Sequence, residues 1–121
     1  MNAKSTLVLG ASLKPERYSY RAMRSLAEYG HPVFAIGNRA GETGGIIIHT
    51  GKPDLKNIHT VTLYLSAENQ EPLCDYILSL KPERIIFNPG AENPVLMKRA
   101  SLLGIKVLEA CTLTMLSIGN Y

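Results

Sequence analysis

The sequence predicts one α/β domain with a mainly parallel, doubly wound sheet of about five strands, covered by helices on both faces. Short apolar segments alternate along the chain with helix-like segments, which is the order that parallel strands and helical crossovers produce. The apolar segments are continuous rather than alternating with polar residues, as expected for strands buried on both faces. No repeat or low-complexity tract interrupts this order, so the domain is predicted to span residues 1–121.

The elements follow in chain order from apolar runs and from the glycines and prolines that end them. Strands are expected at residues 6–9, 33–36, 61–65, 84–87 and 105–108, and helices at 18–29, 69–80 and 94–103. Gly30 and Gly104 stand where helices should end, and Pro32 and Pro82 lie just beyond helix ends. A short closing helix is expected at 112–118, starting from a Thr112 cap. The segment 41–51 is predicted to be a small extra strand or a loop at the sheet edge.

Composition, charge and cysteine spacing exclude several classes of function. Apolar residues make up 45% of the chain and charged residues 19%, as in soluble globular proteins. The net charge of +3 comes without runs of like charge, so no nucleic-acid partner is expected. No apolar run approaches the ~18 residues that a membrane span needs, and the N-terminus has no signal-peptide pattern. Two cysteines 37 residues apart fit neither a metal site nor a disulfide framework. The expected location is cytoplasmic.

A doubly wound sheet binds ligands at the carboxyl ends of its strands, near the point where the strand order reverses. This rule selects the loops at residues 10–19, 37–41, 66–69, 88–93 and 109–112 as candidate binding segments.

The first of these loops has the features of a phosphate-binding turn. Gly10 permits a sharp turn, and Ser12 offers a hydroxyl. A helix follows, whose N-terminal amides can face an anion and which Ser19 is expected to cap. Lys14 and Arg17 add positive charge. The loop lacks the later glycines of an NAD fingerprint, so a different nucleotide is expected. The alternative is an ordinary strand-to-helix turn with solvated basic residues.

The second loop narrows the choice of nucleotide. NAD enzymes usually carry an acidic residue after the second strand to bind the ribose hydroxyls. Here Asn38 and Arg39 follow that strand, and the first carboxylate is Glu42. A guanidinium pairs with phosphate in a bidentate fork, so Arg39 favours a phosphorylated ribose, which NADP and coenzyme A (CoA) both have. The alternative is an exposed arginine in a surface turn.

The loop at residues 88–93 reads Asn-Pro-Gly-Ala-Glu-Asn. Its Pro89-Gly90 pair is a turn signal, and Asn93 before Pro94 is a typical helix cap. Neither role needs Asn88 or Glu92. Both are therefore expected to face the crevice and to contact a ligand amide or hydroxyl.

Candidate catalytic residues are few. His31 falls at the amino end of the sheet, where a structural role is expected, and His49 and His59 are expected at the surface. Cys74 fits the buried side of a helix. Cys111 follows the last strand at the ligand edge, where a helix N-terminus can lower a thiol pKa, but a buried, inert cysteine is expected. The loops hold no histidine to serve as its base. The sequence thus predicts no catalytic residues and no metal ligands.

Taken together, these motifs resemble the small stand-alone CoA-binding domain proteins. The similar segments are Gly10-Ala-Ser with Pro15 and Ser19, Gly30-x-Pro-Val33, the loop at residues 88–93, and the end of the chain at residues 104–116. These are bacterial Rossmann-like domains, three-layer sandwiches related to the nucleotide-binding domain of the succinyl-CoA synthetase α subunit. The resemblance covers nearly the whole chain. Residues 41–56 differ from the sequence expected of the commoner family members, so the resemblance does not assign the residues on the adenine side of the pocket.

The resemblance implies binding of CoA or an acyl-CoA, with NADP as the second choice of cofactor. The residues it places at the ligand are Gly10, Ala11, Ser12, Lys14, Arg17, Tyr18, Ser19, Asn38, Arg39, Ser66, Asn88, Pro89, Gly90, Ala91, Glu92 and Asn93.

The chain lacks the phosphohistidine and ATP-grasp parts of the synthetases, so a binding protein rather than a complete enzyme is expected. Two alternatives stay open: a small NADP-dependent or Cys111-dependent acyl-transfer enzyme, and a regulatory or scaffold domain with a decayed nucleotide site. Expected partners are the nucleotide ligand and either a second copy or an enzyme that uses acyl-CoA. Neither a membrane nor a nucleic acid is expected as a partner.

Overall fold

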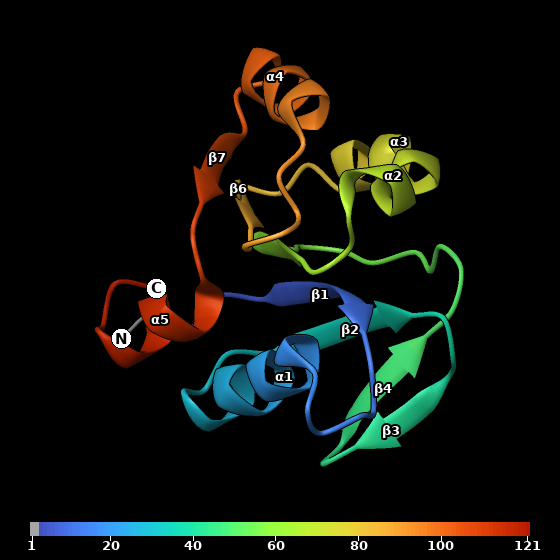
Figure 1. Ribbon diagram of the computed structural model, residues 1–121, viewed down its shortest axis with the longest axis vertical. Helices are drawn as coiled ribbons and strands as arrows, with labels where there is room; N and C mark the ends of the chain where they lie inside the picture. The colour runs from blue at the N-terminus through green and yellow to red at the C-terminus, as the bar shows by residue number, and fades with distance from the viewer. Residues whose placement is uncertain (1–2) are drawn as a thin grey trace.

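A computed structural model describes residues 3–121 and shows a mixed α/β fold (Figure 1). Strands and helices alternate along most of the chain, as the sequence predicts. Their bounds are β1 (Thr6–Ala11), α1 (Tyr18–Glu28), β2 (Val33–Gly37), β3 (Gly41–Thr43), β4 (Ile46–His49), β5 (Thr60–Leu63), α2 (Ala67–Gln70), the 3₁₀ helix η1 (Glu71–Leu73), α3 (Cys74–Ser79), β6 (Arg84–Phe87), α4 (Pro94–Leu102), β7 (Lys106–Glu109) and α5 (Thr112–Ser117).

The strands form one sheet in the order β3-β4-β2-β1-β5-β6-β7. All neighbouring pairs are parallel except β3 with β4. From β1 the chain adds β2 on one side. It later returns to the other side of β1 to add β5, β6 and β7. The order therefore reverses between β1 and β5.

Two apolar cores, one on each face, make the sheet the middle layer of three (Figure 1). Leu7 and Leu9 of β1 point to the face that α3 and α4 cover, where they pack with residues such as Ile77 and Leu96. Val8, between them, points to the other face and packs with residues of α1 and α5. The three-layer, mainly parallel fold predicted from the sequence is confirmed.

The prediction of about five strands was too low, because residues 41–49 form a hairpin of two further strands. Gly44 and Gly45 join β3 to β4. In β4, Ile46 and Ile48 are buried whereas Ile47, between them, is 56% exposed. This period of two fits a strand with one covered face. The hairpin extends the sheet because β4 also pairs with β2.

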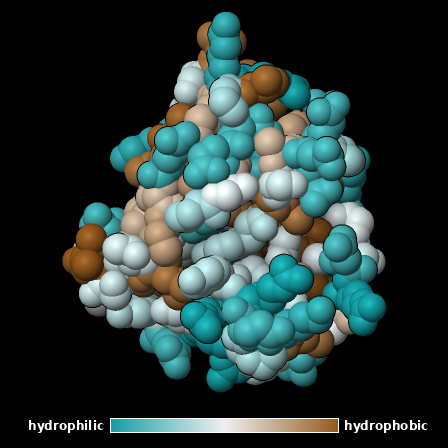
Figure 2. Space-filling model, viewed as in Figure 1, coloured by the Kyte–Doolittle hydropathy of each residue, from teal (hydrophilic) through white to brown (hydrophobic). Residues whose placement is uncertain are grey.

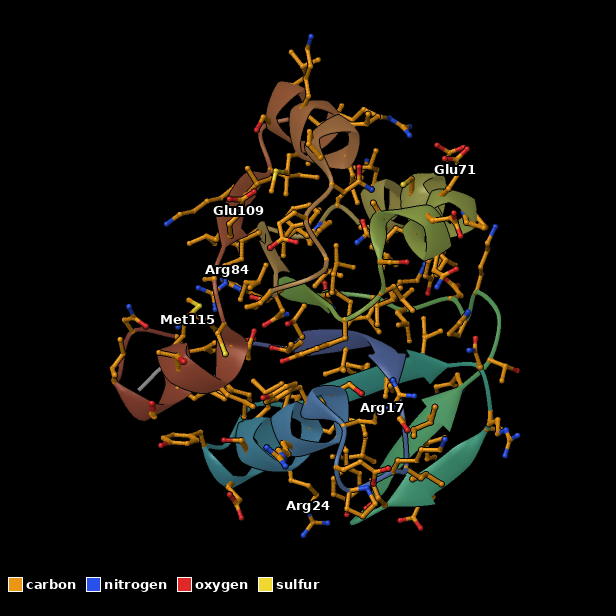
Figure 3. All side chains as sticks on the ribbon, viewed as in Figure 1. Arg17, Arg24, Glu71, Arg84, Glu109 and Met115 are labelled. Carbon is orange, nitrogen blue, oxygen red and sulfur yellow. The ribbon has the colours of Figure 1, made fainter. Side chains whose placement is uncertain are left out.

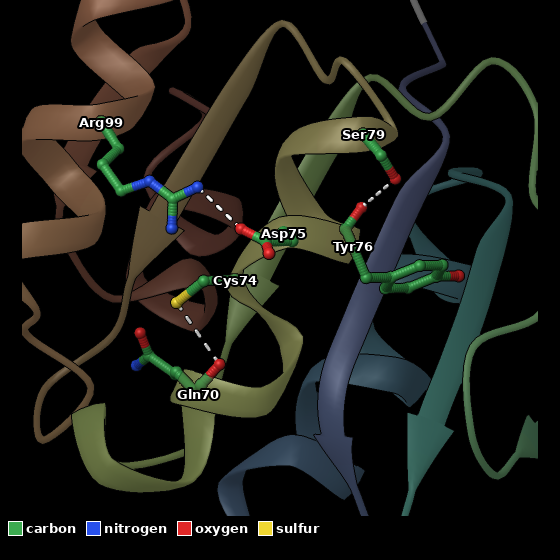
Figure 4. Close-up of polar contacts among 6 residues, drawn as sticks. All are labelled: Gln70, Cys74, Asp75, Tyr76, Ser79 and Arg99. Atoms are coloured by element: carbon green, nitrogen blue, oxygen red, sulfur yellow. Dashed lines mark hydrogen bonds and ion pairs between the residues drawn. The ribbon is translucent and has the colours of Figure 1, made fainter.

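The helix predicted at 69–80 begins earlier and is interrupted. Ser66 accepts a hydrogen bond from the Asn69 backbone N–H and starts α2. Pro72 has no N–H to donate, so the chain passes through the 3₁₀ turn before α3 begins. Figure 4 shows Arg99 of α4 bound to Asp75 of α3 at 2.7 Å, which links the two helices on this face.

No helix within residues 3–121 is long and apolar enough to cross a membrane.

Candidate functional site

The reversal of strand order brings the loops after β1 and β5 together at the carboxyl edge of the sheet. A crevice forms at such an edge because the two crossovers leave it in opposite directions. The loop after β6 lies next to these two. In the view of Figure 2, polar and weakly polar residues cover the middle of the molecule, between the part that carries α2–α4 and the part that carries α1.

The first loop leaves the sheet through a bulge. Leu9 pairs with Ile36 and Ala11 with Gly37, so Gly10 is the extra residue between them. Gly10 has a φ of +94°, which side chains other than glycine rarely adopt. A Cβ at Gly37 would lie 2.3 Å from the Ala11 carbonyl oxygen. The close packing of the ends of β1 and β2 therefore needs a glycine from each strand, and the sequence identified the first of them.

The basic residues of this loop are free at the surface. Lys14, Arg17 and Tyr18 are exposed, and Figure 3 shows Arg17 where α1 begins, beside the end of β1. Ser12 is half-buried, and its hydroxyl accepts a hydrogen bond from the Lys14 backbone N–H at 3.1 Å. The Leu13 side chain lies against Gly41. The β3–β4 hairpin thus borders the loop.

The prediction that Ser19 caps this helix was wrong. The N-cap residue is Arg17, which makes no side-chain capping bond, and Ser19 lies inside the first turn and is 4% exposed. Because its side chain turns toward the core, the hydroxyl does not compete for the amides at the helix start. Those amides remain free of a side-chain cap, which suits an N-terminus that binds an anion.

Asn38 and Arg39 follow β2 at the same edge, as predicted, and both are exposed. No ion pair within residues 3–121 involves Arg39. Its guanidinium is available to an external anion.

Asn88 does not face the crevice, contrary to prediction. It is 2% exposed, and its Nδ2 donates to Thr62 Oγ1 at 2.7 Å and to the Leu63 carbonyl at 2.9 Å. Its Oδ1 accepts from the Thr112 backbone N–H at 2.9 Å. Asn88 therefore joins β5, the end of β6 and the start of α5. A side chain that is buried and makes three hydrogen bonds within the protein positions the loop rather than facing a ligand.

The rest of the loop at residues 88–93 is arranged by its own contacts. Pro89 and Gly90 form an exposed turn, closed by the Ala91 N–H bond to the Asn88 carbonyl. Glu92 is exposed, and its carboxylate accepts from the Gly90 N–H at 3.0 Å. The turn therefore uses Glu92, which the sequence analysis left without a local role. Asn93 caps α4 as predicted.

Gln70 organises the crevice and was missed in the sequence. It is fully buried, and its Nε2 donates to the carbonyls of Leu65 and Ala91, each at 2.8 Å. Its Oε1 accepts from Asn93 Nδ2 at 2.8 Å. This side chain ties the loop after β5 to the loop after β6. The available signal was a polar residue on the apolar side of a predicted helix.

The start of α5 differs from the prediction. Cys111 is the N-cap residue, and Thr112 is the first residue of the helix. The Thr112 hydroxyl is bound to Thr62 Oγ1 at 2.8 Å, so it does not cap its own helix. Beside this pair lies the Tyr64 hydroxyl, which is buried and has no hydrogen-bond partner within the described residues 3–121. Burial raises the pKa of Tyr64 well above its ordinary value.

The pKa values of the two cysteine thiols are shifted in opposite directions. Burial raises the pKa of Cys74, which matches its predicted place against the core. Burial also acts to raise the pKa of Cys111, but the Thr114 hydroxyl and the backbone N–H groups of Thr114 and Leu113 outweigh it and leave that pKa below its usual value. Cys111 is half-buried rather than enclosed.

Two surface hollows lie away from these residues. One, of about 210 Å³, is lined by α1 and the hairpin, and includes Arg24 and Gly44. The other, of about 400 Å³, lies between residues 52–57 and the end of α3. Neither includes a residue that the sequence predicted to bind a ligand. Within residues 3–121, no group of three or more His, Cys, Asp or Glu could hold a metal ion.

Comparisons with known proteins identify the family of the chain. The family model described as "CoA binding domain" matches residues 4–117. A solved structure titled as an uncharacterized protein is 43% identical, with a TM-score of 0.96 and complete coverage of both chains. A Thermus thermophilus protein is 24% identical, with a TM-score of 0.85, over 98% of this chain and 91% of its own.

A larger enzyme contains the same fold. The dinucleotide forming acetyl-coenzyme A synthetase 1 of Ca. Korarchaeum cryptofilum is 19% identical, with a TM-score of 0.71, over 89% of this chain and 26% of its own. No curated protein matches the chain. The match to the family model over residues 4–117 shows that this chain belongs to the CoA-binding domain family.

Proposed function

We propose that this protein binds CoA or an acyl-CoA at the carboxyl edge of the sheet, between the loops after β1, β2, β5 and β6, and that it does not complete a reaction by itself. The observation that carries the proposal is the uncapped start of α1 beside the Gly10 bulge, within a chain that belongs to the CoA-binding domain family.

The first loop supplies what a diphosphate needs. The backbone N–H groups at the start of an α-helix carry partial positive charge and attract anions. No side chain occupies those of α1. Lys14 and Arg17 lie exposed around them and add two full charges. This arrangement favours a ligand with a diphosphate at that point.

The second loop favours a phosphate on the ribose. Arg39 is exposed and free of ion pairs within the described chain, and a guanidinium binds phosphate through two parallel hydrogen bonds. CoA carries a 3′-phosphate and NADP a 2′-phosphate. Family membership favours CoA, and NADP is the second candidate.

The remaining loops suit the pantetheine arm. Ser66 and the turn of Pro89 and Gly90 are exposed at the same edge. Gln70 holds the two loops that carry them at a fixed distance from each other. A ligand with a long, flexible arm binds more tightly to loops that are already ordered, because the protein then loses little conformational entropy on binding.

The arrangement supports binding better than catalysis. His31 and His59 precede β2 and β5 and so lie at the amino edge of the sheet, away from Cys111. His49 ends β4 at the carboxyl edge, but β4 lies toward the opposite end of the strand order from β7, which Cys111 follows. No hydrogen bond or ion pair within residues 3–121 joins a histidine to Cys111. An acyl-transfer reaction through this thiol would need a base from elsewhere.

Calorimetric titration with CoA, acetyl-CoA, NADP and NAD tests the proposal. We expect CoA and acetyl-CoA to bind more tightly than either dinucleotide. The double variant Lys14→Ala, Arg17→Ala should bind CoA about tenfold or more weakly, because each lost charge-assisted contact is worth about 1.5–3 kcal/mol before solvent screening. Tight binding of NAD without binding of CoA would overturn the proposal. Absence of any nucleotide binding, together with a stable homo-oligomer or a partner protein recovered by pulldown, would favour a scaffold with a decayed site.

Cysteine reactivity gives a second prediction. We expect the labelling rate of Cys111 with a thiol reagent to reach half its maximum at a lower pH than that of Cys74, because the pKa of Cys111 is lowered and that of Cys74 is raised from the ordinary thiol value. The variants Cys74→Ala and Cys111→Ala assign each rate. Saturating CoA should slow the labelling of Cys111 and leave that of Cys74 unchanged. Two identical pH profiles would contradict the prediction.

A further inference from the structure

Arg84 is a buried cation at the amino edge of the sheet, opposite the crevice. It is the first residue of β6 and is 8% exposed. In the strand register it lies between Thr60 of β5 and Lys106 of β7. Figure 3 shows it near Met115 of α5 and far from Arg17. It therefore belongs to a different region from the proposed CoA site.

Some of the N–H groups of the Arg84 guanidinium make hydrogen bonds within residues 3–121, and others do not. Its Nε donates to Thr60 Oγ1 at 2.8 Å, and its Cζ lies 4.4 Å from the centroid of the Tyr121 ring. Its Nη2 is buried and has no hydrogen-bond partner among residues 3–121. No carboxylate within residues 3–121 forms an ion pair with it. Arginine is almost never buried without a partner, and an unsatisfied buried donor often marks an unseen ion or water.

The groups around Arg84 add positive rather than negative charge. Lys106 is exposed on the neighbouring strand, and Lys4 lies close enough to act electrostatically on both His31 and His59. Burial is the main cause of the lowered pKa of His31, and the charges of Lys4 and Arg84 add to it. The nearby carboxylate is that of Glu83, which is largely exposed and lies 3.7 Å from His59.

Tyr121 covers this cluster. Its hydroxyl is hydrogen-bonded to Thr6 Oγ1, and its ring lies 4.8 Å from that of His31, between the centroids. Together with the contact to Arg84, these interactions hold one side chain over a region of unbalanced charge. Displacing that ring is the simplest way to open the unpaired edge of the guanidinium.

We propose that Arg84 binds a small oxyanion at the amino edge of the sheet, with the Tyr121 ring as its movable cover. The bound anion accepts hydrogen bonds from Nη2 and is stabilised by Lys4 and Lys106. Inorganic phosphate and a simple carboxylate share this chemistry. The site does not depend on the proposed CoA site, because the two lie at opposite edges of the sheet.

The test titrates the full chain with sodium phosphate or sodium acetate at constant ionic strength. Expected results are a Tm increase of about 5 °C at ten times the dissociation constant, and a shift of the Arg84 Nε resonance in ¹⁵N NMR. The pKa values of His31 and His59 should also rise, because the anion offsets the surrounding positive charge. The anion that gives the larger response, phosphate or acetate, is the one that the Arg84 site prefers.

Two variants make the test decisive. Arg84→Met should fold, because replacing an unpaired buried charge with an apolar side chain is often neutral or stabilising, and it should lose the anion response. The variant Lys14→Ala, Arg17→Ala should keep that response, which excludes phosphate bound at the crevice. Equal responses of the wild type and Arg84→Met, or no shift of the Arg84 resonance, would overturn the proposal. Either result leaves CoA binding to be judged by its own titration.

Discussion

Asn88→Ala should lower the free energy of unfolding by about 3 kcal/mol, the largest effect on stability that we expect of a side chain at the candidate site. The change leaves the buried Thr112 N–H without its acceptor and removes two donors, from Thr62 Oγ1 and from the Leu63 carbonyl. A buried polar group that loses its partner costs its full desolvation penalty. For a domain of this size the loss corresponds to a Tm decrease of about 12 °C.

Thermal and urea unfolding of Asn88→Ala and Asn69→Ala measure this effect. Asn69 is exposed on α2, and its side chain has no hydrogen bond in the structure, so its variant should change stability by less than ~0.5 kcal/mol. Asn88→Asp should also be destabilised, because it keeps the acceptor for Thr112 but loses the donor to β5. A loss below ~1 kcal/mol for Asn88→Ala would show that the three contacts are not essential.

Arg39→Ala should weaken binding of CoA about tenfold and leave binding of dephospho-CoA, which lacks the 3′-phosphate, unchanged. An exposed guanidinium–phosphate contact contributes less than a buried one because solvent screens it, and 1.4 kcal/mol corresponds to a factor of ten. The wild type should therefore prefer CoA to dephospho-CoA by about the same factor, and the variant should not distinguish them. The prediction rests on the proposed function.

Calorimetry with both ligands, on the wild type, Arg39→Ala and Lys98→Ala, completes the comparison. Lys98 is exposed on α4 and serves as a matched loss of one positive charge. If Arg39→Ala weakens CoA and dephospho-CoA equally, Arg39 acts elsewhere on the ligand. If NADP loses affinity in the variant while CoA does not, the second candidate nucleotide becomes the better one.

Most of the fold could be predicted because its signals are local. The strand at residues 84–87 was predicted with its observed bounds, and the helix at 94–103 ends one residue earlier than predicted. An apolar run, a proline at the helix start and an asparagine cap each act within a few residues of the chain. The hairpin at residues 41–49 was only half recognised, because β3 is three residues long and has no apolar run.

The positions of the candidate loops were predictable, but the contacts of their side chains were not. The loops at residues 10–19, 37–41, 66–69 and 88–93 do lie at the carboxyl edge, because parallel strands with right-handed crossovers place them there. Lys14, Arg17 and Arg39 are exposed there. Whether these loops hold CoA stays a prediction that the titrations above will test.

The sequence by itself determined the alternation of strands and helices, the turn at Gly10 and the cap at Asn93, since each depends on residues close together in the chain. Only the tertiary structure decided which polar side chains bind other parts of the protein. Asn88 meets Thr62 and Thr112, each at least 24 residues away, and Gln70 meets Ala91 and Asn93, each at least 21 residues away. A polar residue in a loop has the same local signal whether it faces a ligand or a distant strand. The partner is fixed by which segments the sheet brings together, and that choice is made by packing of the whole chain.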